Sequence, residues 1–143
     1  GVEWLFLFFA INWAGDTGAY FAGKKWGKKK LYPLVSPKKT VEGALGGLAA
    51  SLLVAVVITE SMHLIDRFGG EYDLLSYWHI LALTLAVAVV AQVGDFCESL
   101  LKRAFQVKDS GGLLPGHGGF LDRFDGVILS MPVMAEGLIL VLR

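Results

Sequence analysis

Three aspartates in the second half of the chain have types and spacing that suit a metal ion. Asp122 and Asp125 are three residues apart, which places both carboxylates on one face of a helix. Asp95 follows an apolar run that reaches Val93, and ionisable groups at membrane depth are costly and usually functional. Mg²⁺ prefers oxygen ligands and binds through one or two carboxylates plus substrate phosphates. We therefore expect Asp95, Asp122 and Asp125 to bind Mg²⁺, with a second cation left open.

A glycine-rich segment between these aspartates has the composition of an anion-binding loop. Five glycines within residues 111–119 give a backbone that can turn its N–H groups toward phosphate. Arg123 carries a planar guanidinium that can reach phosphate oxygens. His117 could donate a hydrogen bond to phosphate, act as a general acid, or simply belong to a turn.

Two further sets of polar residues interrupt or extend apolar runs. One set recurs at steps of three and four residues and so shares a helical face that we expect to face the bundle interior or a water-filled site: Gln92, Asp95, Ser99, Lys102 and Gln106. The other centres on Asp16, which glycines flank late in the first apolar run. This pattern predicts a broken or kinked helix end lining a polar cavity, unless Asp16 caps a new helix.

The elements that must position these residues are four apolar blocks. They cover residues 2–23, 44–59, 74–93 and 126–142 of a 143-residue chain that is 55% hydrophobic and only 18% charged. About 20 apolar residues suffice to cross a bilayer, and backbone facing lipid must be helical. We predict an all-α polytopic integral membrane helical bundle with about four spanning helices. Amphipathic or broken helices and a Gly-rich cytosolic loop complete it. The composition excludes a disordered chain and a highly charged nucleic-acid binder.

The loops differ in charge, which predicts their orientation. Residues 24–39 hold seven lysines and no acid, and residues 95–125 add four bases, whereas residues 60–73 are mainly acidic. Four spans place the two basic loops on the same side, and short basic loops stay cytoplasmic. The lysines could serve topology and attraction to lipid headgroups alone.

Several segments resemble one enzyme family. The sequence SLLKR from Ser99, followed after four residues by KDSG and then by LPGHGGFLDRFD ending at Asp125, resembles the signature of phosphatidate cytidylyltransferases, also called CDP-diacylglycerol synthases. Residues 15–28 and 36–43 are similar to other shared segments of that family. Members usually carry further N-terminal spans. Residues 1–143 are therefore interpreted as a single membrane catalytic domain, the C-terminal part of a longer family member.

The resemblance implies a nucleotidyltransferase of phospholipid biosynthesis. Such enzymes join phosphatidic acid to CTP, giving CDP-diacylglycerol and pyrophosphate, and require Mg²⁺. The resemblance also implies contact with membrane lipid, a homodimer and no nucleic-acid partner. We expect the protein in the bacterial inner or plasma membrane, with its active site on the cytosolic side.

The resemblance and the chemistry together assign roles to residues. Transfer of this kind relies on positioning and electrostatic stabilisation, because the phosphatidate oxygen is already anionic. Catalytic roles are expected for Asp95, Lys102, Arg103, Asp122, Arg123 and His117. Substrate contacts are expected for Asp16, Ser36, Lys38, Lys39, Thr40, Ser99, Lys108, Asp109, Gly118 and Gly119.

Two other functions and one packing question stay open at this point. A CTP-dependent lipid kinase of the polyprenol or phytol type would have a related membrane architecture but would release CDP instead of pyrophosphate. A non-catalytic membrane subunit would keep its function after Asp122→Asn. Gly43 and Gly47 form a Gly-x-x-x-Gly pair that could pack within the chain or between two copies.

Overall fold

The computed structural model describes residues 2–67, 76–106 and 121–141, and helices cover most of each predicted apolar block within these residues. The elements in chain order are α1 (Val2–Trp26), β1 (Lys30–Tyr32), β2 (Ser36–Thr40), α2 (Val41–Arg67), α3 (Tyr77–Ala104) and α4 (Leu121–Val141). Within the described residues, two stretches are long and apolar enough to cross a membrane, Val41–Ile65 and Tyr77–Ala104. The prediction of a bundle of helices is confirmed for the described residues, and two of the roughly four predicted spans meet this criterion.

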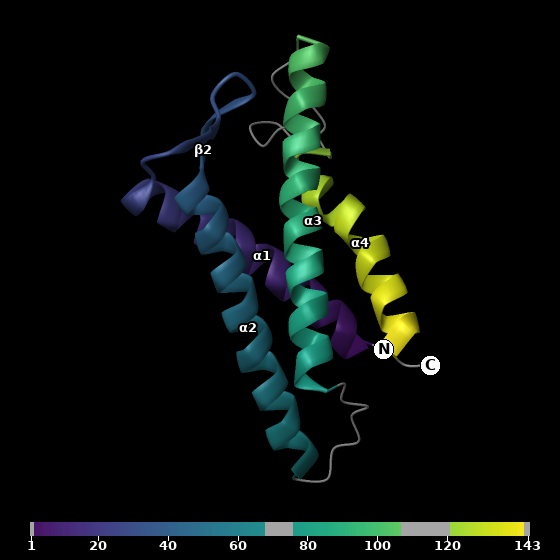
Figure 1. The fold of residues 1–143 in the computed structure, drawn as a ribbon. Helices are drawn as coiled ribbons and strands as arrows, with labels where there is room; N and C mark the ends of the chain where they lie inside the picture. Colours follow the sequence, from purple (N-terminus) through teal and green to yellow (C-terminus); the bar gives the residue numbers. More distant parts are fainter. Residues whose placement is uncertain (1, 68–75, 107–120, 142–143) are drawn as a thin grey trace.

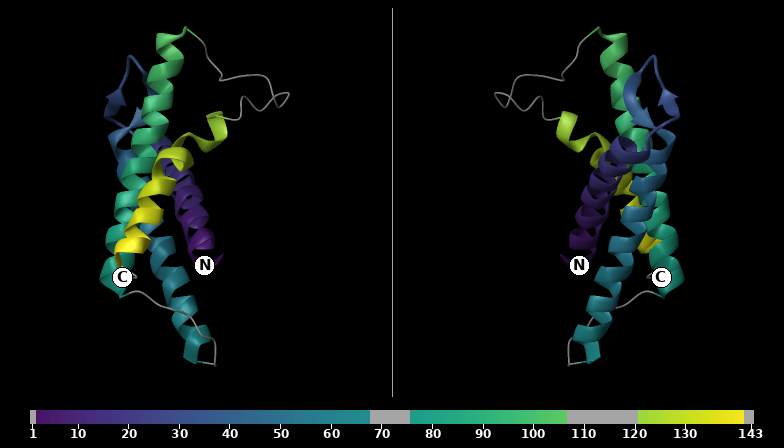
Figure 2. Two further views of the ribbon diagram at one scale, coloured as in Figure 1. Left: turned by 90° about the vertical axis from the view of Figure 1, so that its right-hand side faces the viewer. Right: turned by 90° about the vertical axis from the view of Figure 1, so that its left-hand side faces the viewer.

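The helices form two pairs, which meet mainly through α2 and α3. α1 packs along α2, α4 packs along α3, and α2 contacts α3. The β1–β2 hairpin lies at the same end of the bundle as the C-terminal end of α3 and the start of α4 (Figures 1 and 2). The basic segment 24–39 and the described flanks of segment 107–120 therefore share one end, as the charge pattern predicts.

The prediction of a broken helix at Asp16 is wrong, because α1 is continuous from Val2 to Trp26. Its glycines serve close packing against α2. A Cβ atom on Gly18 would lie 2.4 Å from the Cβ atom of Ala50, and one on Gly15 would lie 2.8 Å from the Ser51 hydroxyl oxygen. Glycine at these positions lets two helices approach closely.

The Gly43 and Gly47 pair packs within the chain. A Cβ atom on Gly43 would lie 2.9 Å from the Ala19 carbonyl oxygen, and one on Gly47 would lie 2.8 Å from the Gly15 carbonyl oxygen. Both glycines are buried in this single chain. The α1–α2 contact therefore accounts for the spacing of these two glycines.

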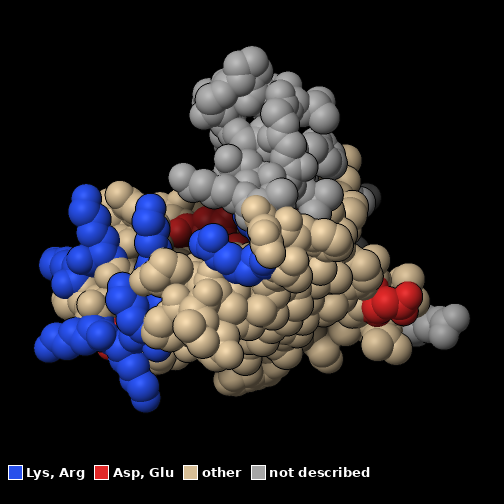
Figure 3. Space-filling model, turned by 90° about the horizontal axis from the view of Figure 1, so that it is seen from above, with Lys and Arg blue, Asp and Glu red and all other residues tan. Residues whose placement is uncertain are grey.

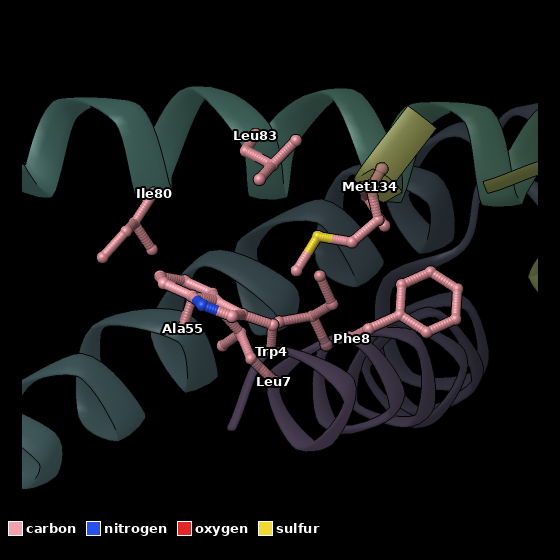
Figure 4. Packing of buried hydrophobic residues seen from close by; sticks show 9 residues of the cluster. Trp4, Leu7, Phe8, Ala55, Ile80, Leu83 and Met134 are labelled. Carbon is pink, nitrogen blue, oxygen red and sulfur yellow. The ribbon is translucent and has the colours of Figure 1, made fainter. Parts of the chain in front are cut away.

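An apolar cluster joins all four helices toward the end opposite the hairpin. Its buried members come from α1, α2, α3 and α4 (Figure 4): Trp4, Leu7, Phe8, Ile11, Ala55, Ile80, Leu83, Val87 and Met134. Polar side chains between this cluster and the hairpin end bond to backbone. The Ser51 hydroxyl donates to the Ile11 carbonyl at 2.7 Å, and the Asn12 amide donates to the Phe8 carbonyl at 2.8 Å.

The hairpin was not predicted from the lysine-rich sequence. β1 and β2 are antiparallel, with Lys30 opposite Thr40 and Tyr32 opposite Ser36. Thr40 then caps α2, because its hydroxyl oxygen accepts a hydrogen bond from the Gly43 N–H at 3.1 Å. The strand therefore leads directly into the long helix, and its side chains have fixed places at the top of the bundle.

The polar stripe of α3 is shorter than predicted. The helix ends at Ala104, and Gln106 follows it with φ of 56° in the left-handed region. Gln106 is therefore not on the helical face that carries Gln92, Asp95, Ser99 and Lys102. A left-handed residue just after a helix is a common way of ending it.

Candidate functional site

A cavity of about 610 Å³ lies between α1, α2, α3 and the hairpin. Six residues predicted for substrate or metal contacts line it: Asp16, Ser36, Lys38, Lys39, Thr40 and Asp95. They come from α1, β2 and α3, which are distant in sequence. Lys24 and Lys30 also line this cavity, so its hairpin side is basic. Small and apolar residues also line the cavity, including Ile11, Ala44 and Ala88.

Lys39 and Asp95 form an ion pair in the wall of the cavity. The Lys39 ammonium nitrogen is 2.5 Å from a carboxylate oxygen of Asp95, and the two side chains are 28% and 42% exposed. Gln92, one turn before Asp95 on α3, donates to the Ala44 carbonyl of α2 at 3.0 Å. The pair joins β2 to α3 and places a positive charge against one of the predicted metal ligands.

Asp95 also belongs to a cluster of three carboxylates. One carboxylate oxygen each from Asp95, Glu98 and Asp125 lies within 4.8 Å of the other two. Two of the three predicted metal ligands are thus brought together. Glu98 was missed, although it lies three residues after Asp95 and four before Lys102, so the helical spacing used for the polar stripe includes it.

The cluster has the chemistry of a site for a hard cation. Glu98 is only 5% exposed. One of its carboxylate oxygens is 3.0 Å from the Lys102 ammonium nitrogen, whereas the other is buried and accepts no hydrogen bond from the part of the chain that the structure describes. A buried carboxylate oxygen without a partner is costly. An oxygen-seeking divalent cation would satisfy this set, so the residues present fit Mg²⁺.

The surroundings of Asp125 point the same way. Asp125 precedes the apolar run of α4, and its carboxylate accepts a hydrogen bond from the Gly126 N–H at 2.6 Å. Carboxylates this close to one another repel unless a cation or a proton lies among them.

Glycines let α3 and α4 cross closely enough to form the cluster. A Cβ atom on Gly94 would lie 2.8 Å from the Asp125 carbonyl oxygen, and one on Gly126 would lie 3.1 Å from the Ala91 carbonyl oxygen. The crossing therefore occurs beside the carboxylates. Any larger residue at Gly94 would have to displace backbone.

Other predicted residues lie beside the cavity and the cluster, or outside the residues that the structure describes. The Ser99 hydroxyl donates to the Asp95 carbonyl one turn earlier at 2.9 Å. The Arg103 Nε donates to the Val35 carbonyl of the hairpin turn at 3.3 Å. Predicted residues outside the described part of the chain are Lys108, Asp109, His117, Gly118 and Gly119; Asp122 and Arg123 lie in the first turn of α4, where only the backbone is described.

Seen from the hairpin end, basic groups lie along one edge of the surface and border a recess that holds acidic groups (Figure 3). Lysine and arginine side chains gather around one edge, and acidic side chains lie in a recess beside them (Figure 3). The basic edge corresponds to the segment that holds seven lysines in residues 24–39. Lysines at this end therefore produce a positive potential beside the carboxylate cluster, which favours an anionic ligand.

The fold and the site define a class of protein. This is a helical membrane protein with a basic cavity and a carboxylate cluster together at one end of its bundle. The sequence profile of the Cytidylyltransferase family matches residues 1–140. The chain belongs to this family.

Individual relatives agree with the family match. The chain is 43% identical over 134 residues to a phosphatidate cytidylyltransferase of Bacillus subtilis, which covers 94% of this chain and 46% of that protein. It is 42% identical to one of Staphylococcus haemolyticus and 44% identical to one of Staphylococcus aureus, in each case over 94% of this chain and 48% of the relative. The chain thus spans about half the length of the curated relatives it matches.

A solved structure shares the fold. It is described as an intramembrane enzyme for archaeal membrane lipids biosynthesis, and it matches with a TM-score of 0.64 and 19% sequence identity. The match covers 91% of this chain and 75% of that chain. The helical arrangement is therefore one that a solved membrane protein adopts.

Proposed function

We propose that this chain carries the nucleotide-transfer site of a phosphatidate cytidylyltransferase. The reaction joins the phosphate of phosphatidic acid to the CMP part of CTP and releases pyrophosphate. The observation that carries the proposal is the Asp95, Glu98 and Asp125 cluster beside a cavity whose wall bears Lys39. A metal-binding carboxylate set next to phosphate-binding lysines is what transfer between two polyanions requires. The names of the bacterial relatives, and the 94% of this chain that they match, support the same activity.

The chain's own residues would bind and orient the phosphates. Lys39 and Lys38 are on the hairpin strand that lines the cavity, and Ser36 adds a hydroxyl from the same strand. Lys39 is already within 2.5 Å of Asp95, so a phosphate bound by Lys39 would lie near the cluster. Positive charge fixed in place lowers the repulsion between the two anionic substrates without reorganisation during the reaction.

Asp95, Glu98 and Asp125 would hold the Mg²⁺ ion, with Asp122 at the start of α4 as a further proposed ligand. When bound, the ion neutralises phosphate charge and stabilises the leaving pyrophosphate. Lys102 restrains Glu98 through a 3.0 Å ion pair. We assign phosphate contacts to Arg103, Lys108 and Arg123, and a catalytic role to His117. Substrate contacts are assigned to Asp16, Ser99 and Asp109.

The proposed function also implies an orientation of the chain in the membrane. All four helices would cross or enter the bilayer, with the hairpin end on the cytosolic side because it carries the lysine-rich segment. CTP is a cytosolic nucleotide, so a cavity at this end suits it. We also propose that the whole enzyme acts as a homodimer, as the family resemblance implies.

The test is a transfer assay with α-³²P-labelled CTP and phosphatidic acid in phospholipid nanodiscs. It uses this chain, and a chimaera in which the chain replaces the matching segment of the Bacillus subtilis relative. We expect labelled CDP-diacylglycerol and unlabelled pyrophosphate, and complete loss of product with EDTA. Release of CDP with a phosphorylated lipid product would instead identify a lipid kinase. EDTA-resistant transfer would contradict the metal site.

A chimaera that is inactive while the parent relative is active would contradict the proposal for this chain. The variant Glu136→Gln provides a matched control, because Glu136 is an exposed acid on α4 outside the cavity and the cluster. Its activity should equal that of the unmodified chimaera.

A further inference from the structure

The β1–β2 hairpin supplies lysines to the cavity, and charge repulsion at its base would push it away from the bundle if no other contact held it. Lys28, Lys29 and Lys30 are consecutive and exposed, and like charges repel. An isolated two-stranded hairpin is marginally stable at best in water. Groups outside the two strands must therefore hold this hairpin in place.

One such group is Glu42, the single acidic residue between Lys24 and Thr59. Its carboxylate accepts hydrogen bonds from the backbone N–H groups of Lys28 at 3.1 Å and Lys29 at 3.2 Å. Next to it, the Val41 N–H donates to the Lys29 carbonyl at 2.9 Å. The first turn of α2 is thereby joined to the residues that lead into β1.

A second attachment holds the other end of the hairpin. The Arg103 Nε of α3 donates to the Val35 carbonyl, and the Tyr32 ring packs edge-on against Phe96 with centroids 6.0 Å apart. Lys39 lies between the two attachments, facing Asp95. The position of its ammonium group therefore depends on where the base and the turn of the hairpin are held.

We propose that Glu42 is a positioning residue that sets the place of Lys39 opposite Asp95 by joining the base of the hairpin to α2. Glu42 does not line the cavity, so it acts through the hairpin and not on a substrate. Charge-assisted hydrogen bonds to backbone N–H groups are among the stronger ones. The consequence for catalysis rests on the proposed function, but the geometry can be measured without any activity.

A simpler role would be that of an acid at a helix N-terminus, which stabilises the first turn of α2. That role predicts faster hydrogen exchange at the start of α2 and no change in the hairpin. The positioning role predicts the reverse. Hydrogen exchange resolved by peptide therefore separates the two.

The experiment compares the full chain in nanodiscs with its Glu42→Ala and Glu42→Gln variants, and with Glu136→Ala as the control acid. We expect amides in residues 30–40 to exchange roughly tenfold faster in Glu42→Ala, with α2 and α3 unchanged. A water-soluble carbodiimide should couple Lys39 to Asp95 in the unmodified chain, and mass spectrometry should find this crosslink reduced several-fold in Glu42→Ala. Glu42→Gln keeps one acceptor oxygen and should fall between the two. Glu136→Ala should match the unmodified chain.

Unchanged exchange and crosslinking in Glu42→Ala would overturn the proposal, as would loss of protection confined to α2. In the chimaera, Glu42→Ala should raise KM for CTP several-fold while kcat changes less than about twofold, with partial recovery in Glu42→Gln. An unchanged KM with a loosened hairpin would overturn the catalytic consequence. If the unmodified chimaera transfers no cytidylyl group, the proposed function fails, whereas exchange and crosslinking still decide the role of Glu42.

Discussion

The two ends of this bundle are built from different kinds of side chain. Away from the hairpin, large apolar residues from all four helices pack together, and Phe8 is only 1% exposed. At the hairpin end, small residues surround a cavity of about 610 Å³, and lysines and carboxylates face one another. Close packing thus characterises the first region, and open space with crowded charge characterises the second.

The difference between the two ends explains how the helices stay associated around the polar region. Crowded carboxylates and an open cavity both oppose tight association of helices. The apolar cluster fixes α1 and α4 against the long helices from the other end, and close glycine contacts continue the α1–α2 and α3–α4 interfaces toward the site. In a membrane, packing of this kind drives helix association. Variants in the two regions should therefore fail in different ways.

The largest effect is expected from Asp95→Asn in the polar region. Asp95 belongs to the carboxylate cluster and pairs with Lys39, so its charge would bind the cation and also hold the lysine in place. Loss of one electrostatic group of this type commonly lowers kcat by about 100-fold or more. The transfer assay on the chimaera measures this loss, and thermal unfolding should show that the helices remain folded.

Mn²⁺ binding followed by electron paramagnetic resonance provides a second measurement. Asp95→Asn should weaken binding at least about tenfold, whereas Glu136→Gln should leave it unchanged. Full activity of Asp95→Asn, or an equal loss in the Glu136 control, would remove the cluster from the mechanism.

The next largest effect is expected from Phe8→Ala in the apolar region. Truncating a buried phenylalanine leaves a cavity and typically costs about 3 kcal/mol of unfolding free energy. Phe6 provides a matched control on the same helix, because it is 65% exposed. Unfolding in mixed micelles should show the loss for Phe8→Ala and almost none for Phe6→Ala. The Mn²⁺ affinity of folded Phe8→Ala should stay within about twofold of the parent; a larger fall would mean that the two regions are not separable.

Much of the fold could be predicted from the sequence, because long apolar runs leave few choices in a membrane. Most of each block lies within a helix, although α2 and α3 extend well beyond the C-terminal ends of their blocks. The break at Asp16 was mispredicted because glycine next to a polar residue can either end a helix or let a second helix pack closely. Gly15 and Gly18 leave room for α2 instead of ending a helix, and only the partner's position distinguishes the two cases.

The site was predictable where helical spacing places residues together. Asp95 and Asp125 meet as expected, and Glu98 could have been found by the same spacing from Asp95. The Lys39–Asp95 pair could not be predicted, since it joins residues 56 positions apart through a hairpin with no clear strand pattern. Charge composition indicated that lysines gather at this end, but it does not determine which one faces a carboxylate.

Gly94→Ala should have a smaller effect, which changes both the stability and the Mn²⁺ affinity. The added Cβ atom would meet the Asp125 carbonyl oxygen at 2.8 Å, so α4 must move away from α3 beside the cluster. Overpacking of this kind costs about 1–3 kcal/mol, and we expect Mn²⁺ affinity to fall with stability. Gly137→Ala is the matched control on the same helix pair, because the atoms nearest its added Cβ belong to the Leu83 side chain and not to backbone. It should lower stability without weakening Mn²⁺ binding. Equal Mn²⁺ affinities for the two variants would show that the crossing does not set the cluster geometry.

The smallest effect is expected from Thr40→Val at the junction of β2 and α2. The Thr40 hydroxyl oxygen accepts the Gly43 N–H and thereby caps α2, although the residue also lines the cavity. Loss of such a cap costs about 1 kcal/mol, whereas Thr40→Ser keeps the hydroxyl. Unfolding measurements should therefore separate valine from serine by that amount. Transfer assays then decide whether the hydroxyl also serves the polar region: equal KM for CTP in both variants assigns Thr40 to the helix alone, and a raised KM in Thr40→Val assigns it to the substrate as well.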